Sequence, residues 1–336
     1  MKKISVAVLG ATGAVGQRFV SLLHNHPYFE IAALCGSSRS AGGVYKEKTN
    51  WLIGPSIPER VASMEVILPD PSCMPEAVSI VFSAIPSETA IEIEGAFAKE
   101  GYKVFSNTRT YRMEKDVPLV VPEVNADHIA LVETQKARGW KGFIVTNPNC
   151  IAIPLAIALK PLYDLFGVRK VIVSTMQAIS GAGYPGVPAL DIIDNVIPFI
   201  SGEETKVISE TQKILGQIGK DADIAISPSC HRVASIDGHL IDAHISLGKR
   251  AEIHDVKRAL TDFKGAISGM NLPSAATEIS LVSSDTMTTT ASVCSVIPKA
   301  ARCLVPMILL KFGLSDNGNK QAAAMIRSPR QINPPS

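Results

Sequence analysis

The segment ISVAVLGATGAVG, residues 4–16, decides the fold. Its apolar first half, Ile4–Leu9, predicts a buried strand, and the glycine-rich turn Gly10–Gly16 leads into a predicted helix over Val15–Leu23. Glycines at such a turn let the backbone approach a pyrophosphate, toward which the N–H groups of the following helix point. A purely structural turn is the alternative. The strand–turn–helix order at the chain start favours a dinucleotide site with contacts at Gly10, Thr12, Gly13, Ala14 and Val15.

The rest of the first half repeats this alternation of short apolar runs and amphipathic stretches. A second helix is predicted over Glu88–Lys99, and further strands over Glu30–Cys35, Ile80–Ala84, Val104–Asn107 and Phe143–Thr146. Strands alternating with helices predict a parallel, doubly wound sheet. The fold class expected for residues 1–149 is therefore α/β, a Rossmann-like nucleotide-binding domain.

The second half has a different pattern. Val168–Gln177 and Gly238–Leu247 resemble longer strands with polar alternation, and Asp255–Phe263 resembles a helix across one face. We expect residues 150–291 to form an α+β domain for catalysis and dimerisation. From residue 292 to residue 336 the apolar residues follow neither the helical nor the strand period clearly, which predicts an atypical C-terminal tail.

Composition excludes several classes of protein. The chain has 336 residues, of which 46% are hydrophobic and 19% charged, as in a globular protein. Its net charge of +2 argues against nucleic acid or a membrane surface as partner. Six cysteines without a Cys-x-x-Cys pair suit neither a disulfide scaffold nor a zinc site, so we expect no metal. No signal peptide or membrane span is evident, so a soluble cytoplasmic protein is expected.

The end of the second predicted strand indicates the cofactor. An NAD site places Asp or Glu there to bind the ribose hydroxyls, whereas this chain has Ser37, Ser38, Arg39 and Ser40. Hydroxyls and a guanidinium suit a 2′-phosphate, which a carboxylate would repel. The segment therefore predicts NADP, with an ordinary polar loop as the alternative.

Cys150 is the candidate nucleophile. It ends the run TNPNC, residues 146–150, between the apolar stretch Gly142–Val145 and a predicted helix over Ile151–Phe166. The thiol therefore lies near the positive end of a helix dipole, where the field favours the thiolate. The alternative is a small, buried and inert cysteine.

Several side chains of the second half are candidate partners for this thiol. His239, in Asp237-Gly238-His239, has the titration range of an acid/base group, and His231 is the alternative. Gln177 ends a predicted strand and precedes a glycine-rich loop suited to close backbone approach, which makes Ser180 and Gly181 cofactor candidates. The remaining candidates are Glu203, Lys206 and Arg232, and, from the first half, Arg112 after a strand end. The alternative for Glu203 and Lys206 is an ion pair on a helix surface, and the alternative for Arg112 is a solvated arginine in a loop.

Together these segments resemble the aspartate-β-semialdehyde dehydrogenase family, closest to its archaeal and fungal branch. The resemblance rests on segments in family order: GATGAVGQ from Gly10, SSRSAG from Ser37, YRMEKDVPLVVPEVN from Tyr111, NPNC from Asn147, STMQAISGAGYPGVPALDIIDNVIP from Ser174, GEETKV from Gly202 and CHRVASIDGH from Cys230.

The resemblance implies NADPH-dependent conversion of L-aspartyl-4-phosphate to L-aspartate 4-semialdehyde through a thioester on Cys150, in lysine, threonine and methionine biosynthesis. It also implies a dimer or tetramer. The implied roles are acid/base for His239, orientation of the intermediate for Gln177, oxyanion stabilisation for Asn149, substrate carboxylate and amino binding for Arg232 and Glu203, and phosphate binding for Arg112 and Lys206.

Other functions remain open at this point. N-acetylglutamyl-phosphate reductase is a weaker rival, because that family usually has Gly before its Cys and this chain has Asn149. A reductase of a different acyl group, such as malonyl-CoA, uses the same scaffold, although Glu203 and Arg232 favour an amino-acid substrate. The aspartate-β-semialdehyde dehydrogenase family's Asn-Thr-x-x-Gly-Ala-Ala segment is matched poorly by Asn317–Ala323, so a catalytically impaired NADP-binding protein with a divergent or frame-shifted tail is a further alternative.

Overall fold

This computed structural model describes residues 2–54, 56–270 and 272, together with the backbone of four later strands that end at residue 325. The chain divides into two compact units. Unit 1 comprises Met1–Val120 and Asp127–Pro148, and unit 2 comprises Val121–Ala126 and Asn149–Ser336. In the described ranges, every helix is too short or too polar to cross a membrane.

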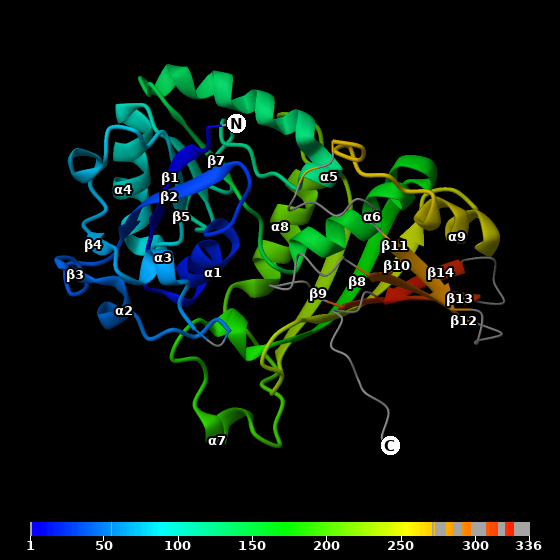
Figure 1. Ribbon diagram of the computed structural model, residues 1–336. Helices are drawn as coiled ribbons and strands as arrows, with labels where there is room; N and C mark the ends of the chain where they lie inside the picture. Colours follow the sequence, from blue (N-terminus) through cyan, green and yellow to red (C-terminus); the bar gives the residue numbers. More distant parts are fainter. Residues whose placement is uncertain are drawn as a thin grey trace. The chain divides into compact units, whose positions relative to one another are not determined.

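Unit 1 is built on a seven-stranded sheet in the order β3-β4-β2-β1-β5-β6-β7, shown from blue to green in Figure 1. All its pairings are parallel except that between β3 and β4. The strands are β1 (Ile4–Leu9), β2 (Phe29–Cys35), β3 (Gly43–Val44), β4 (Glu65–Ile67), β5 (Ile80–Ser83), β6 (Lys103–Ser106) and β7 (Phe143–Thr146). The doubly wound sheet is confirmed, and the five predicted strands lie within one residue of their expected bounds. The two short strands β3 and β4 were not predicted.

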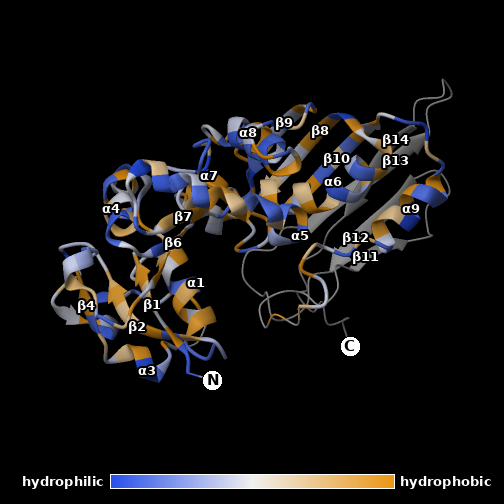
Figure 2. Cartoon of the chain, turned by 90° about the horizontal axis from the view of Figure 1, so that it is seen from above, coloured by the Kyte–Doolittle hydropathy of each residue, from blue (hydrophilic) through white to orange (hydrophobic). Residues whose placement is uncertain are grey.

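Helices cover both faces of this sheet. They are α1 (Ala14–Leu23), α2 (Tyr45–Lys48), α3 (Glu59–Ala62), α4 (Ser87–Glu100) and the 3-10 segments η1 (Pro71–Cys73) and η2 (Ala126–Arg138). One buried cluster, which includes Val8 and Val20, lies on the α1 face, and another, which includes Phe97 and Val104, lies on the α4 face. Because both faces are covered, β1 and β2 are largely hydrophobic in Figure 2.

Unit 2 contains a second seven-stranded sheet, in the order β11-β12-β13-β14-β10-β8-β9. The strands are β8 (Val168–Gln177), β9 (Ala225–Arg232), β10 (Leu240–Leu247), β11 (Ser280–Ser284), β12 (Thr290–Val296), β13 (Met307–Leu314) and β14 (Lys320–Met325). The helices are α5 (Pro122–Asn125), α6 (Ala152–Phe166), η3 (Ile179–Ala182), α7 (Ala189–Ile192), α8 (Glu203–Leu215) and α9 (Ile253–Thr261). Helix α6 packs on β8 and β10 and contacts α8 and α9. The expected α+β architecture is confirmed.

Strand β9 was not predicted, because Pro228 and several polar residues interrupt its pattern. The strand lies at one end of the sheet and pairs in parallel with β8. A proline is tolerated at such an edge, where a missing N–H breaks no ladder bond. On the outer side of β9, Arg232 exchanges two backbone hydrogen bonds with Ile197.

The predicted tail, residues 292–336, lies largely outside the described residues. Most of β12, with β13 and β14, is described there as backbone only, although the sequence showed no strand period in this stretch. The candidate segment Asn317–Ala323 is described only from residue 320. That this tail is atypical stays a prediction.

Candidate active site

Three strand ends meet at one edge of the unit 2 sheet and carry three of the predicted side chains. Gln177 and Arg232 are register partners at the ends of the parallel strands β8 and β9. Strand β10 runs antiparallel to β8, and its first residue, Leu240, pairs with Met176, so the preceding residue His239 lies beside Gln177. The topology therefore gathers an amide, a guanidinium and an imidazole at one place.

Cys150 and His239 are in direct contact. The His239 Nε2 and Cys150 Sγ atoms lie 3.2 Å apart, and Cys150 is half-buried. His231, the alternative partner, directs its ring nitrogens to the Thr175 carbonyl and the Ser229 hydroxyl. Cys150 is thus not a small apolar residue enclosed in the core, and the imidazole that meets its sulfur is that of His239.

The backbone of Ala178 connects His239 to Arg232. The Ala178 N–H donates to His239 Nδ1 at 3.0 Å, and the Ala178 carbonyl accepts from Arg232 Nη1 at 2.9 Å. An Nδ1 that accepts leaves the hydrogen of the neutral ring on Nε2, which faces the sulfur. Burial lowers the pKa of His239, the Arg232 charge lowers it further, and Gly238, Glu203 and Asp237 oppose this less strongly. His239 is therefore held as a neutral ring.

Gly181 makes room for the same arginine. A Cβ atom at position 181 would lie 2.8 Å from Arg232 Nη1 and 3.7 Å from His239 Cε1. The shorter distance is below any ordinary contact, so a side chain here would displace the guanidinium. The glycine therefore leaves room for the guanidinium of Arg232, which is 7% exposed.

Asn149 fixes the turn that precedes Cys150. Its Oδ1 accepts from the N–H groups of Ile151 and Ala152, at 2.8 and 3.4 Å, and its carbonyl accepts the first intrahelical bond, from Ile153. By its hydrogen bonds Asn149 therefore caps the turn that leads into α6, and the thiol lies just before the first residue of that helix, Ala152. The Asn149 Nδ2 atom donates to Glu203 Oε1 at 2.9 Å.

Glu203 and Lys206 form an ion pair that is not a surface pair. Lys206 Nζ lies 3.1 Å from Glu203 Oε2, and Glu203 is only 5% exposed. Burial alone would raise the pKa of Glu203, but hydrogen bonds from Asn149 and Gln177 and the charge of Lys206 outweigh it, so this pKa lies below its usual value. Glu203 is a buried, ionised carboxylate next to the turn that carries the thiol.

Glu210 is a site residue that the sequence analysis missed. Its Oε2 accepts the backbone N–H of Asn149 at 2.5 Å, and the side chain is 2% exposed. Glu203, Val207, Glu210 and Ile214 recur at helical spacing and are all buried. Two carboxylates on the buried face of a helix are unusual, and this pattern was the available signal.

The predicted cofactor residues of unit 1 form a loop at the carboxyl end of β1. Gly10 has φ +75°, and a Cβ at Gly16 would lie 2.0 Å from the Gly10 carbonyl oxygen, so only glycine fits at either position. The N-terminus of α1 has neither a side-chain cap nor an acidic residue in its first turn. A pyrophosphate fits this loop, because its charge suits the uncapped end of the helix.

Two further predicted binding segments also lie in unit 1. Ser37, Ser38 and Arg39 follow β2 and are exposed, with Ser40 half-buried behind them, as a 2′-phosphate contact requires. Arg112 is buried rather than solvated, and its Nη2 donates to the Asn107 carbonyl at 3.0 Å. The residues of unit 1 therefore fit NADP and an anionic group.

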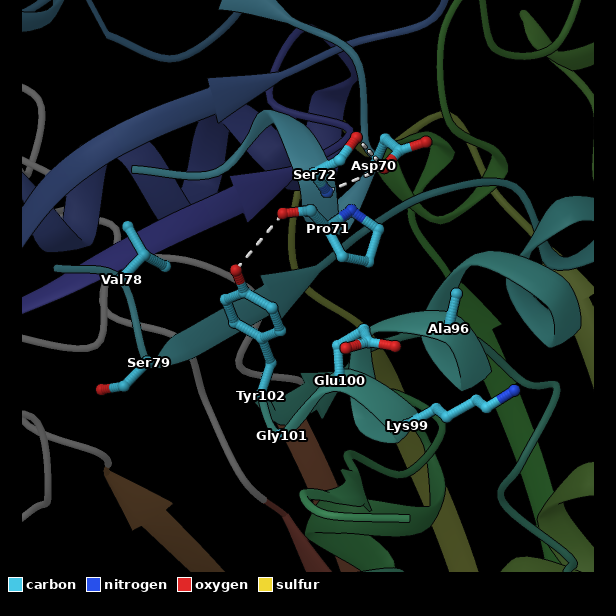
Figure 3. Close-up of a pocket in the computed structure, with 10 residues that line it drawn as sticks. All are labelled: Asp70, Pro71, Ser72, Val78, Ser79, Ala96, Lys99, Glu100, Gly101 and Tyr102. Carbon is cyan, nitrogen blue, oxygen red and sulfur yellow. Dashed lines mark hydrogen bonds between the residues drawn. The ribbon is translucent and has the colours of Figure 1, made fainter. Parts of the chain in front are cut away.

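A pocket of about 750 Å³ lies at the amino-terminal ends of β5 and β6, away from the carboxyl end of β1 that carries the glycine loop (Figure 3). Its polar wall groups bond to one another: Asp70 accepts from Ser72, and the Tyr102 hydroxyl donates to the Pro71 carbonyl. The pocket contains none of the predicted residues. Among the described residues there is also no cluster of three or more His, Cys, Asp or Glu side chains that could hold a metal ion.

Comparison with known families gives two matches along the chain. Residues 5–132 match the NAD-binding domain of semialdehyde dehydrogenases, and residues 159–293 match their dimerisation domain. The two matched ranges together span most of the chain up to residue 293.

Individual relatives agree with these matches. An aspartate-semialdehyde dehydrogenase of Methanothermobacter thermautotrophicus is 50% identical over 277 residues, 81% of this chain and 79% of that protein. A malonyl CoA reductase (NADP) of Metallosphaera sedula is 38% identical over 82% of this chain and 78% of that protein. The crystal structure of the Candida albicans aspartate-semialdehyde dehydrogenase with NADP superposes with a TM-score of 0.78 at 34% identity, covering 96% of this chain and 93% of that one.

Proposed function

The chain belongs to the aspartate-semialdehyde dehydrogenase family, and on this basis we propose that it reduces L-aspartyl-4-phosphate to L-aspartate 4-semialdehyde with NADPH. The reaction releases phosphate and feeds lysine, threonine and methionine biosynthesis. The observation that carries the proposal is the contact of 3.2 Å between His239 Nε2 and Cys150 Sγ, which lies at the turn just before α6. A thiol in this setting suits nucleophilic attack on an acyl carbon.

The covalent chemistry takes place on Cys150. The thiolate attacks the acyl carbon, the C–O bond to phosphate breaks, and a thioester forms. NADPH supplies the hydride that reduces the thioester carbon. The oxygen of the resulting thiohemiacetal lies beside His239, and His239 Nε2 donates a proton to it. When the thiohemiacetal collapses, Nε2 takes this proton back, the carbon–oxygen double bond of the aldehyde forms, and the sulfur leaves as the thiolate. Gln177 orients the intermediate, and Asn149 with the Cys150 N–H stabilises its oxyanion.

Charged side chains recognise the substrate. Arg232 binds the α-carboxylate and Glu203 the α-ammonium, while Lys206 and Arg112 bind the phosphate. The ionised state of Glu203 supports its role, because a buried carboxylate attracts an ammonium group. A coenzyme A thioester of malonate has no α-amino group, so Glu203 favours the amino-acid substrate over the acyl-CoA alternative.

NADP is the proposed cofactor. Gly10, Thr12, Gly13, Ala14 and Val15 would hold the pyrophosphate, and Ser37, Ser38, Arg39 and Ser40 the 2′-phosphate; Ser180 and Gly181 complete the set. The glycine geometry of the loop and the uncapped α1 N-terminus support the first group. The absence of an acidic side chain from the exposed residues 37–39 supports NADP over NAD.

The proposed organisation follows the family. Residues 1–149 form the NADP-binding domain, residues 150–291 the catalytic and dimerisation domain, and residues 292–336 an atypical tail. The match to a dimerisation domain supports a homo-oligomer, and we propose a homodimer or homotetramer in the cytoplasm.

The test uses the full-length protein in the reverse direction. Incubation with NADP, phosphate and L-aspartate 4-semialdehyde should form NADPH, at a rate that depends on phosphate, and Cys150→Ala should form none. Replacing the substrates by NADPH and malonyl-CoA tests the acyl-CoA alternative. NADP binding without turnover of either substrate would instead identify an impaired NADP-binding protein.

A further inference from the structure

Helix α8 contacts Asn149, the residue before the nucleophile, at two points. Glu203 accepts from the Asn149 side chain at 2.9 Å, and Glu210 accepts from the Asn149 backbone N–H at 2.5 Å. The two carboxylates are seven residues apart, which places them on one face of the helix, two turns from each other. One residue of the turn is therefore held at both its backbone and its side chain by a single rigid element.

These contacts leave little freedom for the turn. The Asn149 Oδ1 atom is engaged by the N-terminus of α6, Nδ2 by Glu203 and the backbone N–H by Glu210. The bond to Glu210 fixes the backbone nitrogen of Asn149, and the position of the Asn149 backbone in turn sets the position of the next residue, Cys150. The contact of 3.2 Å between Cys150 Sγ and His239 Nε2 consequently depends on how α8 holds Asn149.

Glu203 and Glu210 have different tasks in this arrangement. Glu203 also pairs with Lys206 and is proposed above to bind the substrate ammonium. Glu210 has no part in the proposed chemistry, yet it is 2% exposed and its carboxylate forms a short hydrogen bond. Charge-assisted hydrogen bonds of this kind are about twice as strong as neutral ones, so the bond suits a fixed anchor.

We propose that Glu210 is a positioning residue for the nucleophile, whose carboxylate fixes the Asn149 peptide and thereby directs Cys150 Sγ at His239. The effect on turnover rests on the proposed function, whereas the effect on the thiol does not. Catalysis is sensitive to such placement: a displacement of about 1 Å costs about 10²-fold in rate.

Paired substitutions in the full-length protein test this proposal. Glu210→Met keeps the approximate volume and removes the acceptor, whereas Glu210→Gln keeps an acceptor oxygen and removes the charge. Thr211→Val, on the same helix, is the matched control, because the Thr211 hydroxyl is buried and has no hydrogen-bond partner among the described residues. Each variant is measured for kcat, for KM of the semialdehyde and NADP, and for iodoacetamide labelling of Cys150 by mass spectrometry.

We expect Glu210→Met to lower kcat by about 10- to 100-fold with little change in KM for NADP, and Glu210→Gln to restore most of the rate. Labelling of Cys150 should slow about threefold or more in Glu210→Met, while labelling of the exposed Cys73 serves as internal reference and stays constant. Thr211→Val should match the wild type in every measurement.

Two results would overturn the proposal. One is a Glu210→Met protein with wild-type kcat and wild-type labelling of Cys150; the other is a Glu210→Gln protein as impaired as Glu210→Met. If Glu210→Met does not fold, Glu210→Asp replaces it, since the shorter side chain withdraws the acceptor and should give an intermediate loss. If the wild type turns over no semialdehyde, the proposed function fails, but the labelling comparison still decides the role of Glu210.

Discussion

Replacing Asn149 tests how the nucleophilic turn is held. Asn149→Ala removes the acceptor that caps α6 at Ile151 and Ala152 and the donor to the buried Glu203. Loss of an N-cap costs about 0.5–2 kcal/mol. Glu203 keeps its contacts with Gln177 and Lys206, so the second loss is that of one hydrogen bond to a charged group, about 1.5–3 kcal/mol. We therefore expect Asn149→Ala to lower the free energy of unfolding by about 2–5 kcal/mol.

Asn149→Ser separates the two contributions. A serine hydroxyl caps a helix nearly as well as an asparagine amide, but it is too short to reach Glu203. It should therefore recover the capping part, about 1 kcal/mol of the loss. Asn147→Ala is the matched control in the same loop, because among the described residues its side chain makes only a long hydrogen bond of 3.4 Å, to Asn107.

Scanning calorimetry without nucleotide measures these differences. At about 2–4 °C per kcal/mol, Asn149→Ala should melt roughly 4–20 °C below the wild type and Asn149→Ser a few degrees above Asn149→Ala. Asn147→Ala should melt within about 2 °C of the wild type. Equal melting temperatures for Asn149→Ala and Asn149→Ser would refute the capping contribution, and a wild-type value for both would refute the whole argument.

The other predictions concern turnover, cofactor choice and pH. Cys150→Ala should abolish NADPH formation and leave NADP binding, followed by calorimetric titration, unchanged; retained turnover would remove this residue from its role. Arg39→Asp should weaken NADP binding far more than NAD binding, whereas an equal loss would show that Arg39 does not contact the 2′-phosphate. Because burial and then the Arg232 charge lower the pKa of His239, activity should fall only below the usual histidine range as pH decreases, and His239→Ala should cost about 10²–10⁴-fold in kcat. Arg232→Met should raise the pH at which the His239 ring titrates, measured by NMR; an unchanged midpoint would disprove the electrostatic coupling. Gly181→Ala should displace the guanidinium and reduce kcat/KM for the semialdehyde about tenfold or more, and an unaltered value would contradict the space argument.

The sequence predicted the elements whose signal is local. Buried parallel strands such as Ile4–Leu9 and Phe143–Thr146 are continuous apolar runs and appear at their expected bounds. Val168–Gln177 was equally visible, because one face of that strand is exposed and its side chains alternate. The glycine loop could be predicted because the backbone geometry at Gly10 and Gly16 allows only glycine.

Features that depend on tertiary context were not readable in the same way. β9 carries Pro228 in mid-strand, and a proline is acceptable only once the strand is known to be at an edge. Glu210 resembles any helical glutamate until α8 is packed against the turn at Asn149. The link through the Ala178 backbone could not be predicted at all, because a peptide group carries no sequence signature.

The outer side of β9 has a consequence for self-association. Successive residues of a strand point their N–H groups to opposite sides, so Arg232, Cys230 and Pro228 share the outward direction. The Arg232 N–H is bonded to Ile197, that of Cys230 to the Glu204 carboxylate at 3.2 Å, and Pro228 has none. Of the four outward positions of β9, only Ile226 is left with an N–H that another strand could use, so a second chain finds no continuous row of donors here, which disfavours edge-to-edge aggregation.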